Sequence, residues 1–232
     1  MGSDIHKAIY PNKGPQNTIL AYQLMLAQDV ADEIIVVTGY KHEDIECYLK
    51  RYFSHLPLKI VYNEHYADYG SNYSLILGIQ TADERADELI FLEGDLVFDA
   101  IAFRQIVRAR KNVITSNKSL IDASKSVVFY VNDKKQITYL YDPSHHLLKV
   151  DEPFLVMGNS GQVWKFTNVK KLKNNLKHYE MKDYKATNLV LINDYYKDIN
   201  YENIEMVTFD KWFNCNTVQD FEEIKNYMCK EK

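Results

Sequence analysis

An acidic tripeptide follows one of the most apolar segments of the chain. Residues 88–93 form a short hydrophobic run that ends in Glu93-Gly94-Asp95. Open α/β sheets bind ligands beside the carboxyl ends of their parallel strands, which is where this run would place Asp95. A carboxylate there can hold Mg²⁺, a cation that prefers oxygen ligands and joins them to phosphates. Asp95 can equally cap the turn after the strand, and the spacing alone does not decide between the two roles.

Aromatic residues form a second group that could bind a ligand. The chain contains 18 Tyr and 2 Trp, and an aromatic face attracts a quaternary ammonium group by about 0.5–2 kcal/mol per ring. The rings that the expected strands of the second half could bring into one cage are Tyr130, Tyr139, Tyr141, Trp164 and Trp212. Ordinary packing in the core and on the surface is the other explanation of these rings.

Other polar clusters have simpler explanations. The pair His145-His146 lies near two aspartates and could suggest zinc, but adjacent strand residues point to opposite faces, which favours a loop pair. Four lysines between residues 170 and 177 fit either an anion-binding helix face or a solvated one. The sequence shows no Ser-His-Asp, Cys-His or H-E-x-x-H arrangement.

The elements of the first half alternate between helical and strand periods. Apolar residues recur at helical spacing in three segments and form short β-branched runs in three others. These are the expected helices 17–30, 43–53 and 72–81 and the expected strands 33–38, 58–62 and 88–93. Parallel neighbours need long crossover connections, so helices that alternate with buried strands predict an α/β fold with a mixed, mainly parallel central sheet flanked by helices.

The second half is expected to add antiparallel strands and more helices. Its expected elements are a hairpin of strands 126–132 and 136–141, strands 154–157, 162–166 and 204–209, and helices 169–176, 184–196 and 218–228. No Ser-, Gly- or Pro-rich linker separates the two halves, and the sequence contains no internal repeat. We therefore expect one domain over residues 1–232, with a nucleotide-binding half (1–116) and a half for a second substrate (117–232).

Composition excludes several classes of protein. A chain of 232 residues with 46% hydrophobic and 26% charged residues can bury a core, which excludes a disordered chain. No apolar run approaches the roughly 18–20 residues that cross a bilayer, and no signal peptide is visible. The net charge of −4 argues against binding to nucleic-acid backbones. Three cysteines without a C-x-x-C motif fit a reducing, cytoplasmic compartment.

Several segments, taken in order, resemble the nucleotidyltransferases of the GT-A type, especially the branch of the choline-phosphate cytidylyltransferases and sugar-phosphate nucleotidyltransferases. The segments of the first half are 32–40, 60–63, 72–75 and 93–95. In the second half, residues 158–166 resemble the acceptor-side strand of that family, and residues 212–220 resemble its W-x-E-I-D-T-x-x-D stretch. The resemblance begins at about residue 17 and implies a Rossmann-like fold with an antiparallel acceptor-side extension.

The resemblance implies a reaction and a set of roles. A nucleoside triphosphate, with CTP favoured, would condense with a phosphorylated small molecule and release pyrophosphate, with Mg²⁺ as cofactor. The implied catalytic residues are Asp95 and Lys125, and the implied metal ligands are Asp95 and Asn216. Lys13, Asn72, Ser74 and Gly94 would lie near the nucleotide, and Tyr130, Trp164 and Trp212 near the acceptor. Asn72 can instead cap the helix through Ser74.

Two features depart from the family pattern. The family opens with a strand and a glycine-rich loop, roughly L-A-A-G-x-G-x-R, whose backbone N–H groups hold phosphates, followed by a P-K pair. Either Gly2-Ser3 is a remnant of that loop, with Asp4 in place of Arg, or residues 7–10 are the first strand and the loop is absent; a cloning scar would also explain Gly2-Ser3. Asn216 stands where the family usually has a metal-binding Asp, and its amide brings no negative charge.

Three functions are consistent with these residues. The favoured one is transfer of CMP or a related nucleotide to a phosphocholine-like, phosphonate or sugar-phosphate acceptor. The second is a catalytically impaired homologue that binds a nucleotide or metabolite, and the third is a GT-A glycosyltransferase. The expected partners are a nucleoside triphosphate and a phosphorylated small molecule, without nucleic acid.

Overall fold

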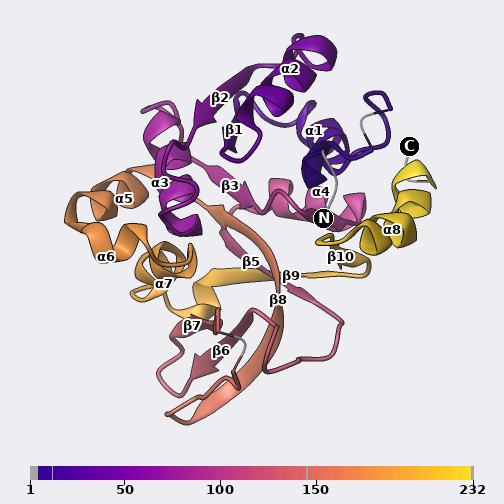
Figure 1. Ribbon diagram of the computed structural model, residues 1–232. Coiled ribbons are helices and arrows are strands. Elements are labelled where there is room, and N and C mark those ends of the chain that lie inside the picture. Colours follow the sequence, from indigo (N-terminus) through magenta and orange to yellow (C-terminus); the bar gives the residue numbers. More distant parts are fainter. Residues whose placement is uncertain (1–4, 12, 145, 231–232) are drawn as a thin grey trace.

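A computed structural model of the chain describes residues 5–11, 13–144 and 146–230 (Figure 1). The predictions for Gly2, Ser3, Asp4 and His145 fall outside the described residues. Lys7–Ile9 form the 3₁₀ helix η1, so the alternative in which residues 7–10 are the first strand is wrong. Within the part of the chain that is described, no helix has both the length and the apolar character needed to cross a membrane.

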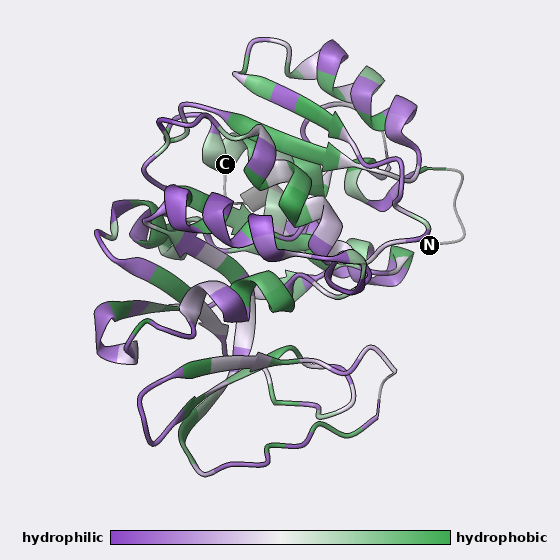
Figure 2. Ribbon diagram, turned by 90° about the vertical axis from the view of Figure 1, so that its left-hand side faces the viewer, coloured by the Kyte–Doolittle hydropathy of each residue, from purple (hydrophilic) through white to green (hydrophobic). Residues whose placement is uncertain are grey.

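A two-stranded parallel sheet carries the first two helices. Strands β1 (Ile34–Thr38) and β2 (Leu58–Tyr62) pair in parallel from Ile34↔Leu58 to Thr38↔Tyr62. Helices α1 (Ile19–Ala27) and α2 (His42–Tyr52) connect to them and bury one hydrophobic cluster between them. The hydrophobic colour concentrates on the paired strands, whereas the outer helices carry much of the hydrophilic colour (Figure 2). This distribution is expected for amphipathic helices that cover a sheet.

A larger sheet forms the centre of the molecule, with the strand order β7-β6-β8-β5-β9 and β3 paired with β8. Its strands are β3 (Leu89–Leu92), β5 (Asn112–Asn117), β6 (Val128–Asn132), β7 (Ile137–Leu140), β8 (Phe154–Phe166) and β9 (Ile204–Phe209). The expected mixed α/β architecture is confirmed. Among the described strands, however, parallel pairing is confined to β1–β2 and β5–β9, and β8 runs antiparallel to β3, β5 and β6.

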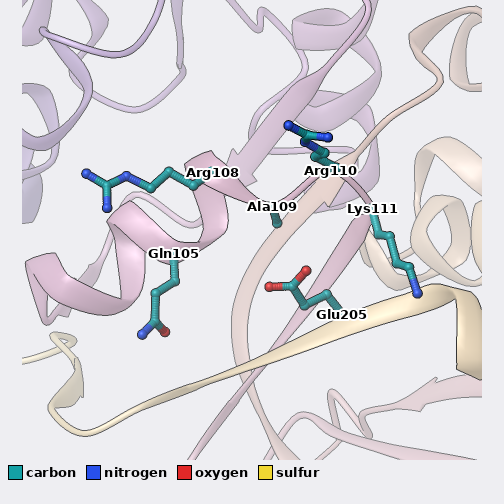
Figure 3. Close-up of a pocket in the computed structure, with 6 residues that line it drawn as sticks. All are labelled: Gln105, Arg108, Ala109, Arg110, Lys111 and Glu205. Atoms are coloured by element: carbon teal, nitrogen blue, oxygen red, sulfur yellow. The ribbon is translucent and has the colours of Figure 1, made fainter.

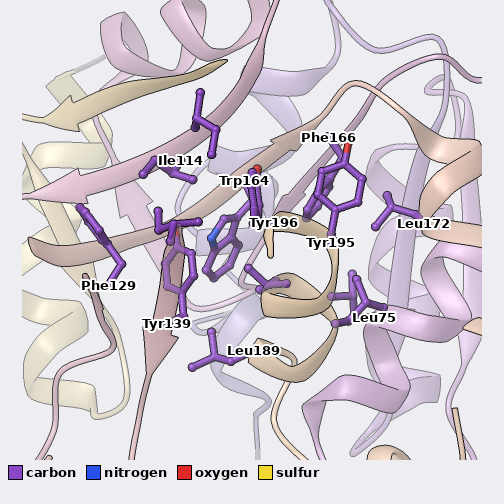
Figure 4. Packing of buried hydrophobic residues seen from close by; sticks show 14 of the residues in the cluster. Leu75, Ile114, Phe129, Tyr139, Trp164, Phe166, Leu172, Leu189, Tyr195 and Tyr196 are labelled. Carbon is purple, nitrogen blue, oxygen red and sulfur yellow. The ribbon is translucent and has the colours of Figure 1, made fainter. Parts of the chain in front are cut away.

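Helices cover both faces of this sheet because successive strand residues point to opposite sides. Ile114 and Trp164 belong to the cluster under α3, α5 and α7 (Figure 4), whereas Val113 and Val163 belong to the cluster under α4. The helices on the first face are α3 (Ser71–Thr81), α5 (Val169–Asn175), α6 (Met181–Tyr184) and α7 (Leu189–Tyr196). The remaining elements are α4 (Ala100–Arg108), α8 (Val218–Lys230), η2 (Leu176–His178), η3 (Tyr201–Asn203) and the antiparallel pair β4 (Leu96–Phe98) and β10 (Trp212–Asn214).

Two predicted boundaries are wrong for physical reasons. The expected strands 154–157 and 162–166 form one strand, because Gly158 lies inside it and lets the Phe129 ring approach the backbone; a Cβ there would lie 2.5 Å from Phe129 Cζ. The expected helix 184–196 begins only at Leu189, as α7, and Tyr184 is instead the last residue of the short helix α6. The backbone at Ala186 and Asn188 bonds to the start of α3, through Asn72 N–H and Ser71 Oγ.

Candidate active site

The ammonium group of Lys7 joins two residues that lie far from it in the sequence. Lys7 Nζ donates hydrogen bonds to Asp95 Oδ2 at 2.7 Å and to Asn216 Oδ1 at 2.9 Å. Such lengths are typical of charge-assisted hydrogen bonds. The structure therefore brings the two expected metal ligands together, with a cation of the chain itself between them.

The loop between β3 and β4 holds Asp95 in place from both sides. Gln23 Nε2, on α1, donates to the carbonyl oxygens of Glu93 at 2.8 Å and Leu96 at 3.0 Å. The backbone N–H of Cys215 donates to the carbonyl of Asp95 at 2.9 Å. These bonds fix the backbone, while the Asp95 side chain keeps 21% of its surface exposed.

The connection between β10 and α8 orients the amide of Asn216. Its Nδ2 donates to Asn214 Oδ1 at 2.8 Å, which leaves its Oδ1 turned toward Lys7. Its backbone N–H and that of Thr217 both donate to Asp220 Oδ2 at 2.8 Å, at the start of α8. Asn214 thus orients the amide oxygen that meets Lys7, and Asp220 holds the backbone of Asn216 at the start of α8.

Lys7 is anchored through its neighbours in η1. Ala8 and Ile9 are buried in the cluster of α1 and α2, and Ala8 N–H donates to His6 Nδ1 at 3.2 Å. Burial of His6, together with the positive charges of Lys7 and Lys41, lowers the pKa of the His6 ring. The backbone is therefore fixed and His6 is uncharged at neutral pH, while the Lys7 side chain, 33% exposed, reaches the acidic loop.

Glu93 adds a second carboxyl group beside Asp95. Asn188 Nδ2, at the start of α7, donates a hydrogen bond to Glu93 Oε1. Burial and the negative charge of Asp95 raise the pKa of Glu93 to about 7, against the opposing effects of the Asn188 bond and of Lys7. Near neutral pH the local charge therefore depends on the protonation of Glu93.

The donor atoms at this point have the chemistry that Mg²⁺ requires. A carboxylate and an amide oxygen are ligands that Mg²⁺ accepts, and substrate phosphates and water usually complete its shell. Across the described residues, no three His, Cys, Asp or Glu side chains are grouped so as to hold a metal ion. Asp95 and Asn216 thus fit a metal that arrives with phosphate ligands, provided that Lys7 leaves the position between them.

The expected nucleotide-side residues lie on or near two loops and α3. Asn72 is fully buried, its Nδ2 donates to the carbonyl of Asp183 at 2.9 Å, and no donor among the described residues reaches its Oδ1. Gly70 is the N-cap of α3, so the alternative of Asn72 as N-cap is wrong. Ser74 Oγ accepts from Asn63 Nδ2 at 3.0 Å. Lys13 and Gly94 are exposed in loops.

The expected acceptor-side residues have other partners in the structure. Lys125 is 76% exposed and lies 3.7 Å from Asp122 Oδ2, and the Tyr130 hydroxyl donates to Glu152 Oε1 at 2.8 Å. Trp164 is 0% exposed and lies among the buried residues of its cluster (Figure 4). Its ring stacks on Phe91 at 5.5 Å between ring centroids. The structure therefore assigns Trp164 to the core rather than to an acceptor site, because its ring offers no surface to a ligand. The same holds for Tyr139, which is 2% exposed.

Trp212 is half-buried, and its indole N–H donates to the carbonyl of Gly161 at 2.8 Å. Tyr141 packs at the edge of the Trp164 cluster. The loop residue His146 lies 3.7 Å from Asp142, consistent with an exposed loop.

A group of four half-buried rings near the start of α3 was not foreseen from the sequence. His65 and Tyr69 stack at 4.5 Å, Tyr69 meets Tyr73 edge-on at 4.9 Å, and Tyr73 meets Tyr184 at 5.3 Å. We call these four residues the aromatic group. They come from the β2–α3 connection, α3 and α6, so no single periodic pattern in the sequence could reveal them.

A separate surface pocket of about 470 Å³ lies at the end of α4 (Figure 3). Its lining residues are Gln105, Arg108, Ala109, Arg110, Lys111 and Glu205. It contains none of the predicted site residues, and its lining combines three cationic side chains with the acidic Glu205, all of them exposed.

The sequence of residues 3–228 matches a protein family described as a domain of unknown function, DUF6564. The chain belongs to the DUF6564 family. This DUF6564 chain is 32% identical over 98 residues to the choline-phosphate cytidylyltransferase of Haemophilus influenzae. The match covers 42% of the DUF6564 chain and 38% of that relative, so it spans well under half of the relative's length.

Solved structures of nucleotidyltransferases share the fold over nearly the whole DUF6564 chain. The inositol-1-phosphate CTP transferase of T. maritima has a TM-score of 0.71 at 15% identity, covering 100% of this chain and 89% of the other. The CTP:phosphocholine cytidylyltransferase of Streptococcus pneumoniae has a TM-score of 0.62 at 14% identity, covering 97% and 90%. These likenesses confirm the Rossmann-like nucleotidyltransferase fold, and together with the curated relative they confirm the resemblance noted in the sequence.

Proposed function

We propose that this DUF6564 chain is a nucleotidyltransferase that moves a nucleoside monophosphate, with CMP favoured, from a nucleoside triphosphate to a phosphorylated small molecule. Phosphocholine, a phosphonate or a sugar phosphate would be the acceptor. The observation that carries the proposal is the convergence of Lys7, Asp95 and Asn216 at the carboxyl end of β3. The cytidylyltransferase from Haemophilus influenzae supports the choice of CTP.

In the proposed reaction, an oxygen of the acceptor phosphate attacks the α-phosphorus of the triphosphate. The bond from that phosphorus to the oxygen bridging the α- and β-phosphates breaks, and pyrophosphate leaves with the bond's electron pair. Two anions must approach one another, so positive charge at the α-phosphate lowers the barrier. Lys7 supplies such a charge, and Mg²⁺, when held by Asp95 and Asn216, would polarise the phosphoryl group further.

The remaining site residues are proposed to act around this centre. Gly94 and Lys13 are exposed and Ser74 is partly exposed, and these three would contact the nucleotide. Asn72, buried at the start of the same helix as Ser74, would support this side of the site from beneath. On the acceptor side, the aromatic group offers half-buried rings suited to a quaternary ammonium group. Lys125, Tyr130 and Trp212 would contribute only if the acceptor reaches the second half of the chain.

The direct test is release of pyrophosphate from CTP, with phosphocholine and Mg²⁺, by the full chain and by Asp95→Ala. We expect the wild type to release pyrophosphate and Asp95→Ala to lose at least 100-fold of the rate while its melting curve stays cooperative. Lys197→Met, which removes a surface lysine paired with Asp194, is the matched control and should keep the rate. Equal rates for Asp95→Ala and Lys197→Met would contradict the assignment of Asp95.

A second candidate is a homologue that binds a nucleotide or metabolite without turnover. The neutral amide of Asn216 and the presence of Lys7 between the two oxygens favour it, because both reduce the attraction for a divalent cation. Calorimetry that detects CTP binding, with no pyrophosphate released for any of the three acceptor classes, would identify this candidate as correct.

A further inference from the structure

The position between Asp95 and Asn216 is occupied by a cation that the chain itself supplies. Both side-chain oxygens lie within 3 Å of the same nitrogen, Lys7 Nζ, at 2.7 and 2.9 Å. Cys215 and Gln23 hold the backbone of the loop that carries Asp95, and Asn214 holds the side-chain amide of Asn216. The arrangement is a built cation site with lysine as its cation.

We infer that Lys7 keeps divalent cations off Asp95 and Asn216 in the free chain, so that a metal enters only when the Lys7 ammonium swings away. The identity of Mg²⁺ as the natural metal rests on the proposed function, whereas the competition between Lys7 and a divalent cation does not. A phosphate group is the chemical class of ligand that would draw Lys7 away, because it offers the ammonium anionic oxygens in exchange.

Charge and tethering explain why the lysine holds the position. Lys7 neutralises the carboxylate that it contacts, Asp95, and this lowers the attraction of the position for a free cation. Free Mg²⁺ dehydrates reluctantly and usually needs phosphates or several carboxylates as ligands. Lys7 needs only the two oxygens that it contacts. Buried Ala8 and Ile9 anchor η1 and keep the ammonium at an effective concentration of about millimolar or above.

The test uses Mn²⁺ alone as the probe, with the full chain and no nucleotide. Electron paramagnetic resonance titration gives the amount of free Mn²⁺ for the wild type and for Lys7→Met, which keeps the length of the side chain and removes its charge. We expect Lys7→Met to bind Mn²⁺ at least tenfold more tightly than the wild type. The double variant Lys7→Met with Asp95→Asn should lose this gain in Mn²⁺ affinity, because it lacks the carboxylate that Lys7 neutralises in the wild type.

Lys197→Met is the control for the loss of one positive charge elsewhere, and it should leave Mn²⁺ affinity as in the wild type. Lys7→Gln serves as a second variant if Lys7→Met does not melt cooperatively. Equal Mn²⁺ affinity of the wild type and both Lys7 variants would overturn the inference, as would an equal gain in Lys197→Met. A gain in Mn²⁺ affinity without any pyrophosphate release by the wild type would leave the inference standing and overturn the proposed function alone.

Discussion

Asn188 at the start of α7 donates a hydrogen bond to the carboxyl group of Glu93, 95 positions earlier in the chain. The backbone N–H of Asn188 also donates to Ser71 Oγ at 3.0 Å, at the beginning of α3. One residue therefore connects the acidic loop to the helix that carries Asn72 and Ser74. Because Asn188 bonds to both, the protonation state of Glu93 affects the contact that joins the acidic loop to the start of α3.

The first prediction concerns this carboxyl group and pH. Its pKa is raised from 4.5 to about 7, chiefly by burial, so the folded chain holds the proton more tightly than the unfolded chain. The stability that Glu93 contributes is then fully present below pH 4.5 and is lost as pH rises through 7. We expect Glu93→Gln to remove this loss, which amounts to at most about 3 kcal/mol.

Urea unfolding at pH 5 and pH 8 measures the effect. The gain in the free energy of unfolding of Glu93→Gln over the wild type should be larger at pH 8 than at pH 5. Glu43→Gln, at an exposed position on α2, is the control and should show the same difference at both pH values. An equal pH dependence in Glu93→Gln and wild type would show that Glu93 does not titrate in this range.

The second prediction concerns the charge at Asn216. Asn216→Asp places a second carboxylate beside Asp95, and a divalent cation gains about twice as much Coulomb energy from it as the Lys7 ammonium does. We expect Mn²⁺ to bind at least tenfold more tightly and pyrophosphate release from CTP to rise. The control, Asn203→Asp on the exposed helix η3, adds the same charge elsewhere. An unchanged Mn²⁺ affinity in Asn216→Asp would exclude this position as a ligand.

The third prediction distinguishes acceptors by the aromatic group. Phosphocholine should raise the melting temperature more than ethanolamine phosphate does, because three methyl groups spread the positive charge over the rings. Tyr73 contacts both Tyr69 and Tyr184, so Tyr73→Leu should reduce the difference between the two ligands. Differential scanning fluorimetry at matched ligand concentrations measures both. Equal shifts for the two ligands in the wild type would remove the aromatic group from acceptor recognition.

The sequence predicts the elements whose stability is local and misses what depends on distant contacts. The expected and observed bounds agree for β2 (Leu58–Tyr62) and β9 (Ile204–Phe209), because apolar, β-branched residues with polar ends favour short strands. The helix α4 and the strands β4, β5 and β10 were not predicted, although α4 is strongly amphipathic in the structure. The helical spacing of apolar residues over 100–108 is a signal in the sequence that indicates α4.

The residues of the candidate site also differ in whether a local pattern or a distant contact defines their role. The position of Asp95 after a buried strand is a local property and was predicted, and the ordered segments of the family resemblance indicated Asn216. The contact of both with Lys7 depends on three segments that meet only in the tertiary structure, so no spacing in the sequence expresses it. The role of Asn188 beside Glu93 was missed for the same reason.

The fourth prediction concerns Lys165, a buried lysine on β8. Its side chain is 1% exposed, and its ammonium donates to the carbonyl oxygens of Val107 at 3.0 Å and Ala109 at 2.6 Å, at the end of α4. It also lies 2.8 Å from Glu88 Oε2. The lysine thus satisfies carbonyl groups that the end of a helix leaves without intrahelical partners.

Lys165→Met keeps the volume of the side chain but leaves those buried carbonyl oxygens without a donor. We expect the free energy of unfolding to fall by about 2–4 kcal/mol, because a buried acceptor that loses its partner costs its full desolvation energy. Glu88→Gln should cost less, since Glu88 is half exposed and the amide oxygen still accepts from Lys165. Lys197→Met, which removes an exposed lysine, should change stability by less than about 0.5 kcal/mol. Guanidinium unfolding of the three variants orders these effects, and a loss in Lys165→Met no larger than in Lys197→Met would show that the end of α4 does not depend on Lys165.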